Sequence, residues 1–184
     1  MQKIQLLSEC VVYENAYFSI LDRHYQLPNG KYHHFFVRKE VDTCCVLAMS
    51  TERQFIVIKE FRAGPQEILV ELPAGRFEGH DDDADQRIEK ELLEETGYRG
   101  KLKKVGVMPT SPYSTRHIHC YYATECKKVA QQQLDHSEHI DVELVSPEEM
   151  RKILMTGASS SCAPGLLAWE WMKQDGILTK DFHF

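Results

Sequence analysis

The sequence predicts an α/β or α+β fold with a mixed sheet and few helices, on three observations. Strand-like runs fill the first part of the chain, a helical pattern follows an acidic stretch near residue 81, and further strands followed by two helices complete the chain. The chain has 184 residues, of which 42% are hydrophobic and 27% charged. This balance suits one globular domain with a sizeable core. An α/β/α sandwich and an α+β fold both fit this order of elements.

The N-terminal part is typical of antiparallel β structure. Residues 11–13 and 17–25 are rich in aromatic and β-branched side chains, as strands usually are. Asn29 and Gly30 form a strong hairpin signal, and residues 33–37 are the expected return strand.

Three more strands are expected before the first helix. Residues 43–49 are apolar on both faces and should be buried, and residues 54–59 should pair back beside them. Residues 68–72 form a short strand, which Pro73 and Gly75 bring to an end.

The first helix is expected after Asp81, Asp82 and Asp83, whose charges match the positive end of a helix dipole. Gly97 stands where a helix commonly ends. Strands return at residues 103–107, 118–123 and 140–145. Ser146 followed by Pro147 predicts the start of a second helix that ends near residue 157, and residues 164–173 predict a third.

Composition excludes several classes of partner. The net charge of −6 disfavours non-specific binding to nucleic acid or to anionic membranes, which requires a basic surface. The six cysteines contain no Cys-x-x-Cys pair, so we expect reduced, mostly buried thiols in a cytoplasmic protein. The start of the chain lacks the apolar stretch of a signal peptide, and no apolar run approaches the ~20 residues that span a bilayer.

The segment from Lys90 to Tyr98 is the most informative about chemistry. On a helix, Glu91 and Glu95 share a face, and Glu94 flanks them. Like charges at this spacing weaken a helix, and a sequence tolerates them most readily where a cation neutralises them. Hard divalent ions such as Mg²⁺ prefer carboxylate oxygens and usually share their shell with substrate phosphates. Taken alone, such a cluster is also typical of a solvated acidic helix face.

Residues 75–98 together resemble the Nudix box, a glycine, five residues, a glutamate, seven residues and then Arg-Glu-aliphatic-x-Glu-Glu-x-Gly-aliphatic. The second half matches closely. Lys90 stands in place of the arginine, Asp81 or Asp82 stands in place of the first glutamate, and one extra residue lies between Gly75 and Lys90. Because lysine lacks the rigid fork of arginine, we expect weaker ordering of the carboxylates without loss of the site.

The resemblance implies an α/β/α sandwich with a mixed central sheet, and hydrolysis of a nucleoside diphosphate linked to another group. It implies that Mg²⁺ or Mn²⁺ is the cofactor. Glu91 and Glu95 would bind the metal directly, the carbonyl of Ala74 would complete the shell, and Glu94 would be a further ligand or a catalytic residue that orients the others. A bound metal polarises phosphorus and lowers the pKa of its water, which a carboxylate then deprotonates.

Segments outside the box resemble the ADP-ribose pyrophosphatase branch of the family. By this likeness Arg62 contacts a substrate phosphate, for which a guanidinium is well shaped, and Glu71 belongs to the same substrate-binding segment. Glu138 matches a catalytic glutamate and is the expected general base, with Asp135 and Glu143 as nearby alternatives. A surface ion pair at Arg62 and a solvated loop carboxylate at Glu138 remain the alternative interpretations.

The N-terminal strands also resemble this branch. The likeness divides the chain into an antiparallel β extension at residues 1–42, which pairs across a homodimer and helps to hold the base, and a hydrolase domain at residues 43–184. Aromatic rings stack well on bases, and Tyr17 and Phe18 are the chosen candidates. Other aromatic residues are available, namely Tyr25, Phe35 and Phe36.

Histidines offer a weaker pattern. His117 and His119 share a strand face, and His136 and His139 could reach one ion, but no further ligand completes a zinc set at the usual spacing. We interpret them as polar strand and loop residues.

The expected function is hydrolysis of ADP-ribose, or of a similar nucleoside diphosphate sugar, to AMP and ribose 5-phosphate. The partner is thus a small nucleotide sugar, with no nucleic acid or membrane. Another nucleotide sugar such as GDP-mannose, or a dinucleotide polyphosphate, is an alternative substrate. A non-catalytic nucleotide-sugar sensor is a further alternative, since the box departs from the family pattern.

Overall fold

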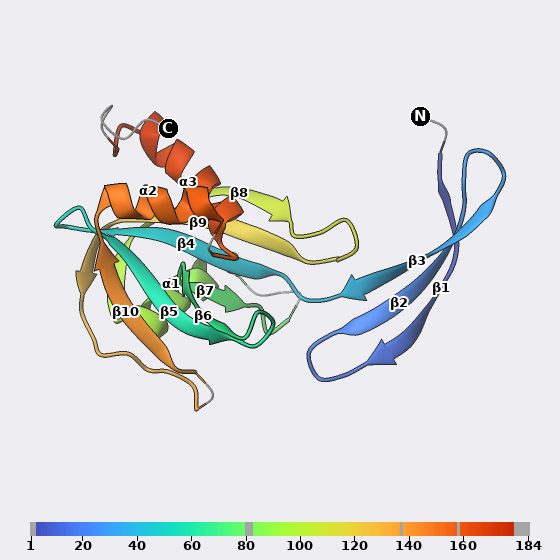
Figure 1. Cartoon of the computed structure of the whole chain (residues 1–184), viewed down its shortest axis with the longest axis horizontal. Helices are drawn as coiled ribbons and strands as arrows, with labels where there is room; N and C mark the ends of the chain where they lie inside the picture. Colours follow the sequence, from blue (N-terminus) through green and yellow to red (C-terminus); the bar gives the residue numbers. More distant parts are fainter. Residues whose placement is uncertain (1–2, 80–82, 137, 158, 179–184) are drawn as a thin grey trace.

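The structure is a computed structural model that describes residues 3–79, 83–136, 138–157 and 159–178. It contains two sheets and three helices among these residues (Figure 1). The first sheet is antiparallel and joins β1 (Gln5–Glu14), β2 (Ser19–Gln26) and β3 (Tyr32–Lys39) in that order. It extends away from the rest of the molecule, which begins with β4 (Figure 1).

The second sheet has seven strands with the order β10-β5-β4-β9-β8, with β6 beside β5 and β7 beside β4. Its strands are β4 (Thr43–Ser50), β5 (Phe55–Arg62), β6 (Glu67–Glu71), β7 (Ala74–Arg76), β8 (Tyr98–Pro109), β9 (His117–Lys128) and β10 (Ile140–Val145). β4 and β9 run parallel, whereas the other pairs are antiparallel. The mixed central sheet confirms the predicted fold class.

Helices cover both faces of this sheet: α1 (Ala84–Thr96) one face, and α2 (Pro147–Thr156) and α3 (Cys162–Gln174) the other (Figure 1). Alternation along β4 explains why both faces are apolar, since Val46 packs with Ile88 of α1 while Leu47 packs with Trp169 of α3. Burying two apolar faces requires a helical layer on each side, so the strand pattern predicted from residues 43–49 leads directly to the three layers.

Sequence-encoded caps set the helix ends. Asp83 caps α1 by accepting hydrogen bonds from the N–H groups of residues 85 and 86, and Gly97 ends it with φ 76°. Ser146 caps α2, with Pro147 in the first turn. These boundaries match the predictions, whereas Asp81 and Asp82 lie outside the described residues.

The strands differ from prediction at the N-terminus. β2 begins at Ser19 instead of residue 17, because the side-chain oxygen of Asn15 accepts hydrogen bonds from the N–H groups of Tyr17 and Phe18 and holds them in a turn. β1 is longer than residues 11–13 and is exposed along its whole length. None of the helices in the described ranges is long and apolar enough to cross a membrane.

Candidate active site

Helix α1 presents the predicted carboxylates toward the body of the protein. Glu91 and Glu95 are buried, with 8% and 5% of their surface exposed, while Glu94 is only half-buried. Ile88 and Leu92 anchor the adjoining apolar face of the helix in the core. The four-residue spacing therefore places two carboxylates on one inward face, as predicted, and they are not part of a solvated helix surface.

Strand β7 holds these two side chains from the other side. The N–H of Ala74 donates to Oε2 of Glu95 at 3.0 Å. A Cβ atom on Gly75 would lie 2.2 Å from Cγ and 2.3 Å from Oε1 of Glu91, so glycine is required for the backbone to approach this carboxylate. The loop before α1 and the helix thus meet at the carboxylates.

Burial, and next to it the nearby negative charges, makes the charged form of these carboxylates costly. Burial raises the pKa of Glu91, and the nearby charges of Glu94 and Glu138 raise it further against the opposing effect of Arg87. Burial also raises the pKa of Glu95 well above its ordinary range, and Glu91, Glu60 and Glu138 add to this despite the hydrogen bond from Ala74. A cation among these groups would offset both effects.

Glu60 is a residue that sequence reasoning missed. It lies on β5 and acts electrostatically on Glu95, and burial raises its own pKa, opposed by Arg62 and reinforced by Glu138 and Glu71. In the sequence, Glu60 and Lys59 alternate along the strand, which indicates that their side chains lie on opposite faces of the sheet. Only the pairing of β5 with β10 brings Glu60 toward the loop of Glu138.

Glu138 lies within electrostatic range of Glu91 and Glu95, as a general base of this site would. Its carboxylate accepts a hydrogen bond from the N–H of Asp135 at 2.9 Å. The loop before it is tied to α1, because the side-chain amide of Gln132 donates to the carbonyl oxygen of Glu95 at 2.7 Å and to that of Ile140 at 3.1 Å. Its role stays a prediction.

Arg62 pairs with two carboxylates of the neighbouring strands β5 and β6. Nη1 of Arg62 is 2.8 Å from Oε2 of Glu60, and its Nε is 3.8 Å from Oε1 of Glu71. About a third of its side chain, 35%, remains exposed, so the guanidinium can still meet a ligand. An ion pair and a phosphate contact are therefore both compatible with this arginine.

Glu71 has a different environment from the one expected of a substrate contact. Its side chain has no exposed surface and accepts hydrogen bonds from the hydroxyl groups of Ser159, Ser160 and Ser161. The N–H of Ser160 donates as well. The serines before α3 thus occupy the hydrogen-bonding positions of this carboxylate. A contact between Glu71 and substrate stays a prediction that these hydrogen bonds do not support.

One carboxylate of the box, Glu91, has an arginine partner at another position than the family pattern gives. Lys90 is 55% exposed at its side chain and lies 3.8 Å from Glu94. Nη2 of Arg87 instead contacts Oε1 of Glu91 at 2.6 Å, and Nη1 contacts Oε1 of Glu78 at 2.6 Å. The four-residue spacing from Arg87 to Glu91 was the sequence signal that the comparison with the box obscured.

Tyr17 and Phe18 lie in the turn between β1 and β2, next to β7. Arg76, the residue after Gly75, donates from Nη2 to the carbonyl oxygen of Tyr17 at 2.5 Å. Tyr17 is 70% exposed, and the guanidinium of Arg38 covers the ring of Phe18 at 4.1 Å. Both aromatic residues line a small cavity of about 210 Å³ together with Arg76. Their stacking on a base remains a prediction.

The carboxylates of α1 are the type of ligand that a divalent metal prefers. Glu91, Glu94 and Glu95 offer hard oxygen ligands, and Gly75 leaves Glu91 the room it occupies. Within the described ranges, however, no three acidic, imidazole or thiol groups already converge on one point. Glu91, Glu95 and Glu94 instead face Arg87, Ala74 and Lys90, so these side chains would have to turn to bind one ion.

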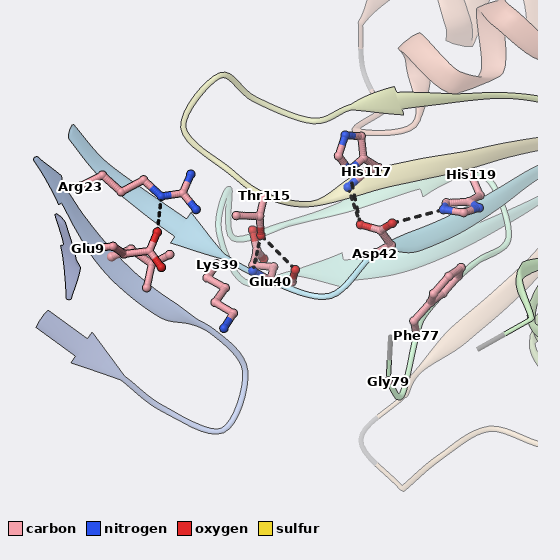
Figure 2. Close-up of a pocket in the computed structure, with 11 residues that line it drawn as sticks. Glu9, Arg23, Lys39, Glu40, Asp42, Phe77, Gly79, Thr115, His117 and His119 are labelled. Atoms are coloured by element: carbon pink, nitrogen blue, oxygen red, sulfur yellow. Dashed lines mark hydrogen bonds and ion pairs between the residues drawn. The ribbon is translucent and has the colours of Figure 1, made fainter. Parts of the chain in front are cut away.

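A larger cavity, about 410 Å³, lies between the N-terminal sheet and the main body, and none of the predicted site residues lines it. Figure 2 shows His117 and His119 directed at the carboxylate of Asp42, with nitrogen–oxygen distances of 3.7 and 3.3 Å. Asp42 also accepts from the N–H of His117. These contacts agree with polar strand histidines.

These features belong to one family of enzymes. A NUDIX domain model matches residues 38–176, so the chain belongs to the Nudix family. It is a Nudix hydrolase, and hydrolysis of nucleoside diphosphate compounds is the general activity that this membership supports. Nudix hydrolases in general need a divalent metal.

Particular relatives narrow the comparison. The chain is 33% identical to the ADP-ribose pyrophosphatase of Bacillus subtilis (strain 168), over 70% of this chain and 71% of that protein. It is 30% identical, over the same shares, to the methanol dehydrogenase activator of Bacillus methanolicus. A solved structure of an ADP compounds hydrolase superposes with a TM-score of 0.80 at 16% identity, covering 97% of this chain and 98% of that one. This last likeness shows the shared fold.

Proposed function

We propose that this chain hydrolyses the pyrophosphate bond of ADP-ribose or a similar nucleoside diphosphate sugar, with Mg²⁺ or Mn²⁺ as cofactor. The observation that carries the proposal is the burial of Glu91 and Glu95 on one face of α1, within electrostatic range of Glu138, while Glu60, the partner of Arg62, acts on Glu95. Crowded carboxylates suit divalent ions, and an arginine next to them suits the phosphate that such ions bind. The named activity of the 33% identical relative supports the same substrate class.

In this mechanism Glu91, Glu95 and the carbonyl of Ala74 would hold the metal, with Glu94 as a further ligand. A bound divalent ion would neutralise diphosphate charge and lower the pKa of a water molecule. Glu138 takes a proton from the attacking water. The water oxygen forms a bond to one phosphorus, the bridging P–O bond breaks, and AMP and ribose 5-phosphate leave. Arg62 orients the phosphates throughout.

The turn of Tyr17 and Phe18 supplies the base site in this proposal. Gly75 lies against Glu91, and the next residue, Arg76, donates to the carbonyl oxygen of Tyr17, so two adjacent residues of β7 link the turn to a predicted metal ligand. An exposed aromatic ring is suited to stacking on a base because every base offers a π-face.

We also propose a homodimer formed through the N-terminal sheet, and a cytoplasmic location in keeping with six free thiols. Strand β1 exposes a set of large apolar side chains that a second copy would cover, namely Leu6, Leu7, Val11, Val12 and Tyr13. Sedimentation equilibrium should give twice the chain mass. A monomer at micromolar concentration would contradict this part of the proposal.

The decisive assay compares kcat/KM for ADP-ribose, GDP-mannose and a diadenosine polyphosphate with Mg²⁺ or Mn²⁺. Run in ¹⁸O-water, it also shows which phosphorus is attacked, through the product that carries the label. We expect ADP-ribose to be the preferred substrate. Preference for another compound would support an alternative substrate, and calorimetric binding of ADP-ribose without release of AMP would support the sensor alternative.

Glu95→Gln tests the proposed metal site, because it removes the charge and keeps the size of a buried predicted ligand. We expect it to abolish most turnover. Glu89→Gln is its control, since Glu89 lies on the same helix but is exposed and pairs with Arg99 at 3.4 Å. Equal activity in the two variants would exclude Glu95 as an essential ligand.

A further inference from the structure

Arg87 bridges two carboxylates that belong to different segments of the site. One nitrogen of its guanidinium contacts Glu91 on α1, and the other contacts Glu78 in the loop that leads from β7 to the helix, both at 2.6 Å. Only 18% of the Arg87 side chain and 10% of the Glu91 side chain are exposed. A guanidinium is planar, so these two contacts orient Glu91 relative to the loop, with the Glu78 side chain itself 73% exposed.

Lys90 cannot provide this contact from its place on the helix. Successive residues are rotated by about 100°, so Lys90 and Glu91 point in different directions, whereas residues four apart lie on the same side. Lys90 accordingly projects toward solvent near Glu94, at 3.8 Å. A lysine is also a point charge that cannot bind two groups in a fixed geometry.

The contact leaves Glu91 able to serve a metal. Arg87 contacts Oε1, and the second carboxylate oxygen has no hydrogen bond among the described residues. Gly75 limits the space on the side of Oε1, because an atom at its Cβ position would lie 2.3 Å away. Glu91 is therefore confined between a backbone segment and a guanidinium, with one oxygen left over.

We infer that Arg87 is the positioning residue that holds Glu91 ready to bind the divalent metal. Lys90 cannot fill this role from its place on the helix. This inference rests on the proposed function. It differs from a purely electrostatic effect, because a positive charge next to a metal ligand repels the metal and would by itself weaken binding. Positioning of Glu91 raises the affinity for the metal, whereas the charge of Arg87 lowers it, so measured affinities of variants separate the two effects.

The test measures Mn²⁺ binding without substrate, by the electron paramagnetic resonance signal of free Mn²⁺. Arg87→Lys keeps the charge and removes the fork, and we expect about tenfold weaker binding, as for other groups that orient metal ligands. Arg87→Gln removes both and should also bind Mn²⁺ more weakly. Unchanged affinity in Arg87→Lys, or tighter binding in Arg87→Gln, would overturn the inference.

Arg99→Lys is the matched control. Arg99 contacts Glu89 of the same helix at 3.4 Å, but both side chains are at least half exposed. We expect its Mn²⁺ affinity to equal that of the wild type, and loss of affinity there would show that any arginine near α1 has the same effect. Circular dichroism of each variant checks that the helix remains folded.

The outcome also separates the two proposals. Wild-type protein that neither binds Mn²⁺ nor hydrolyses ADP-ribose overturns both. Wild-type protein that binds and hydrolyses normally, together with an Arg87→Lys variant of equal affinity, overturns only the role of Arg87. The KM for ADP-ribose at saturating Mn²⁺ should change little in Arg87→Lys, because Arg87 acts through Glu91.

Discussion

Replacing Gly75 with alanine tests the geometry of the site at its tightest point. The backbone of Gly75 is outside the left-handed region, so alanine is acceptable there in conformation. The added Cβ would lie 2.2 Å from Cγ of Glu91, where ordinary contact begins at 3.4 Å. Glu91 therefore has to move by about 1.2 Å, and displacements of this order in an active site lower the rate by about a hundredfold.

The fold should survive this change. Overpacking costs about 1–3 kcal/mol, and the lower entropy of the unfolded chain returns about 0.4–1 kcal/mol for a glycine-to-alanine change. A net loss of about 1 kcal/mol corresponds to a fall in Tm of roughly 2–4 °C for a protein of this size. Calorimetry of the metal-free protein measures this quantity, and kcat/KM with ADP-ribose measures the effect on the site.

Gly79→Ala is the control, because nothing lies within 4 Å of a Cβ atom at Gly79. It should keep wild-type activity and Mn²⁺ affinity. If Gly75→Ala also retained both, the close approach of β7 to Glu91 would have no bearing on the reaction, and the reasoning would be refuted.

Three further predictions follow from the same contacts. Glu138→Gln should lower kcat by at least a hundredfold with little change in KM for ADP-ribose, since it removes a base and keeps the side-chain size; an unchanged kcat moves the base elsewhere. Glu71→Ala should lower the free energy of unfolding in urea by about 3 kcal/mol, because it leaves three serine hydroxyls without their carboxylate; a loss below about 1 kcal/mol would mean that water replaces it. Burial raises the pKa of Glu95 well above 4.5, so this carboxyl binds more protons in the folded protein than in the unfolded chain, and its contribution to stability without metal is lost as pH rises through the raised pKa. Glu95→Gln should therefore gain stability relative to wild type as pH rises, and a pH-independent difference in Tm would contradict this.

Local sequence patterns account for the elements and for part of the site. The spacing of Glu91 and Glu95 determines that they share a helix face, and Gly97 and Ser146 mark helix ends by rules that involve only neighbouring residues. The apolar run at residues 43–49 predicts a strand buried on both faces, and hence a helical layer on each side. These features depend on interactions within a few residues, so the sequence determines them directly.

Only the tertiary structure decided which distant groups meet. Glu60 approaches the loop of Glu138 because β5 pairs with β10, and Glu71 is buried because the serines before α3 fold over it. Arg87 meets Glu78 in addition to Glu91, its helix neighbour four residues on, because Glu78, which follows β7, lies beside α1. Such contacts join segments that no local periodicity relates, and their energies depend on burial, which exists only after the layers have packed.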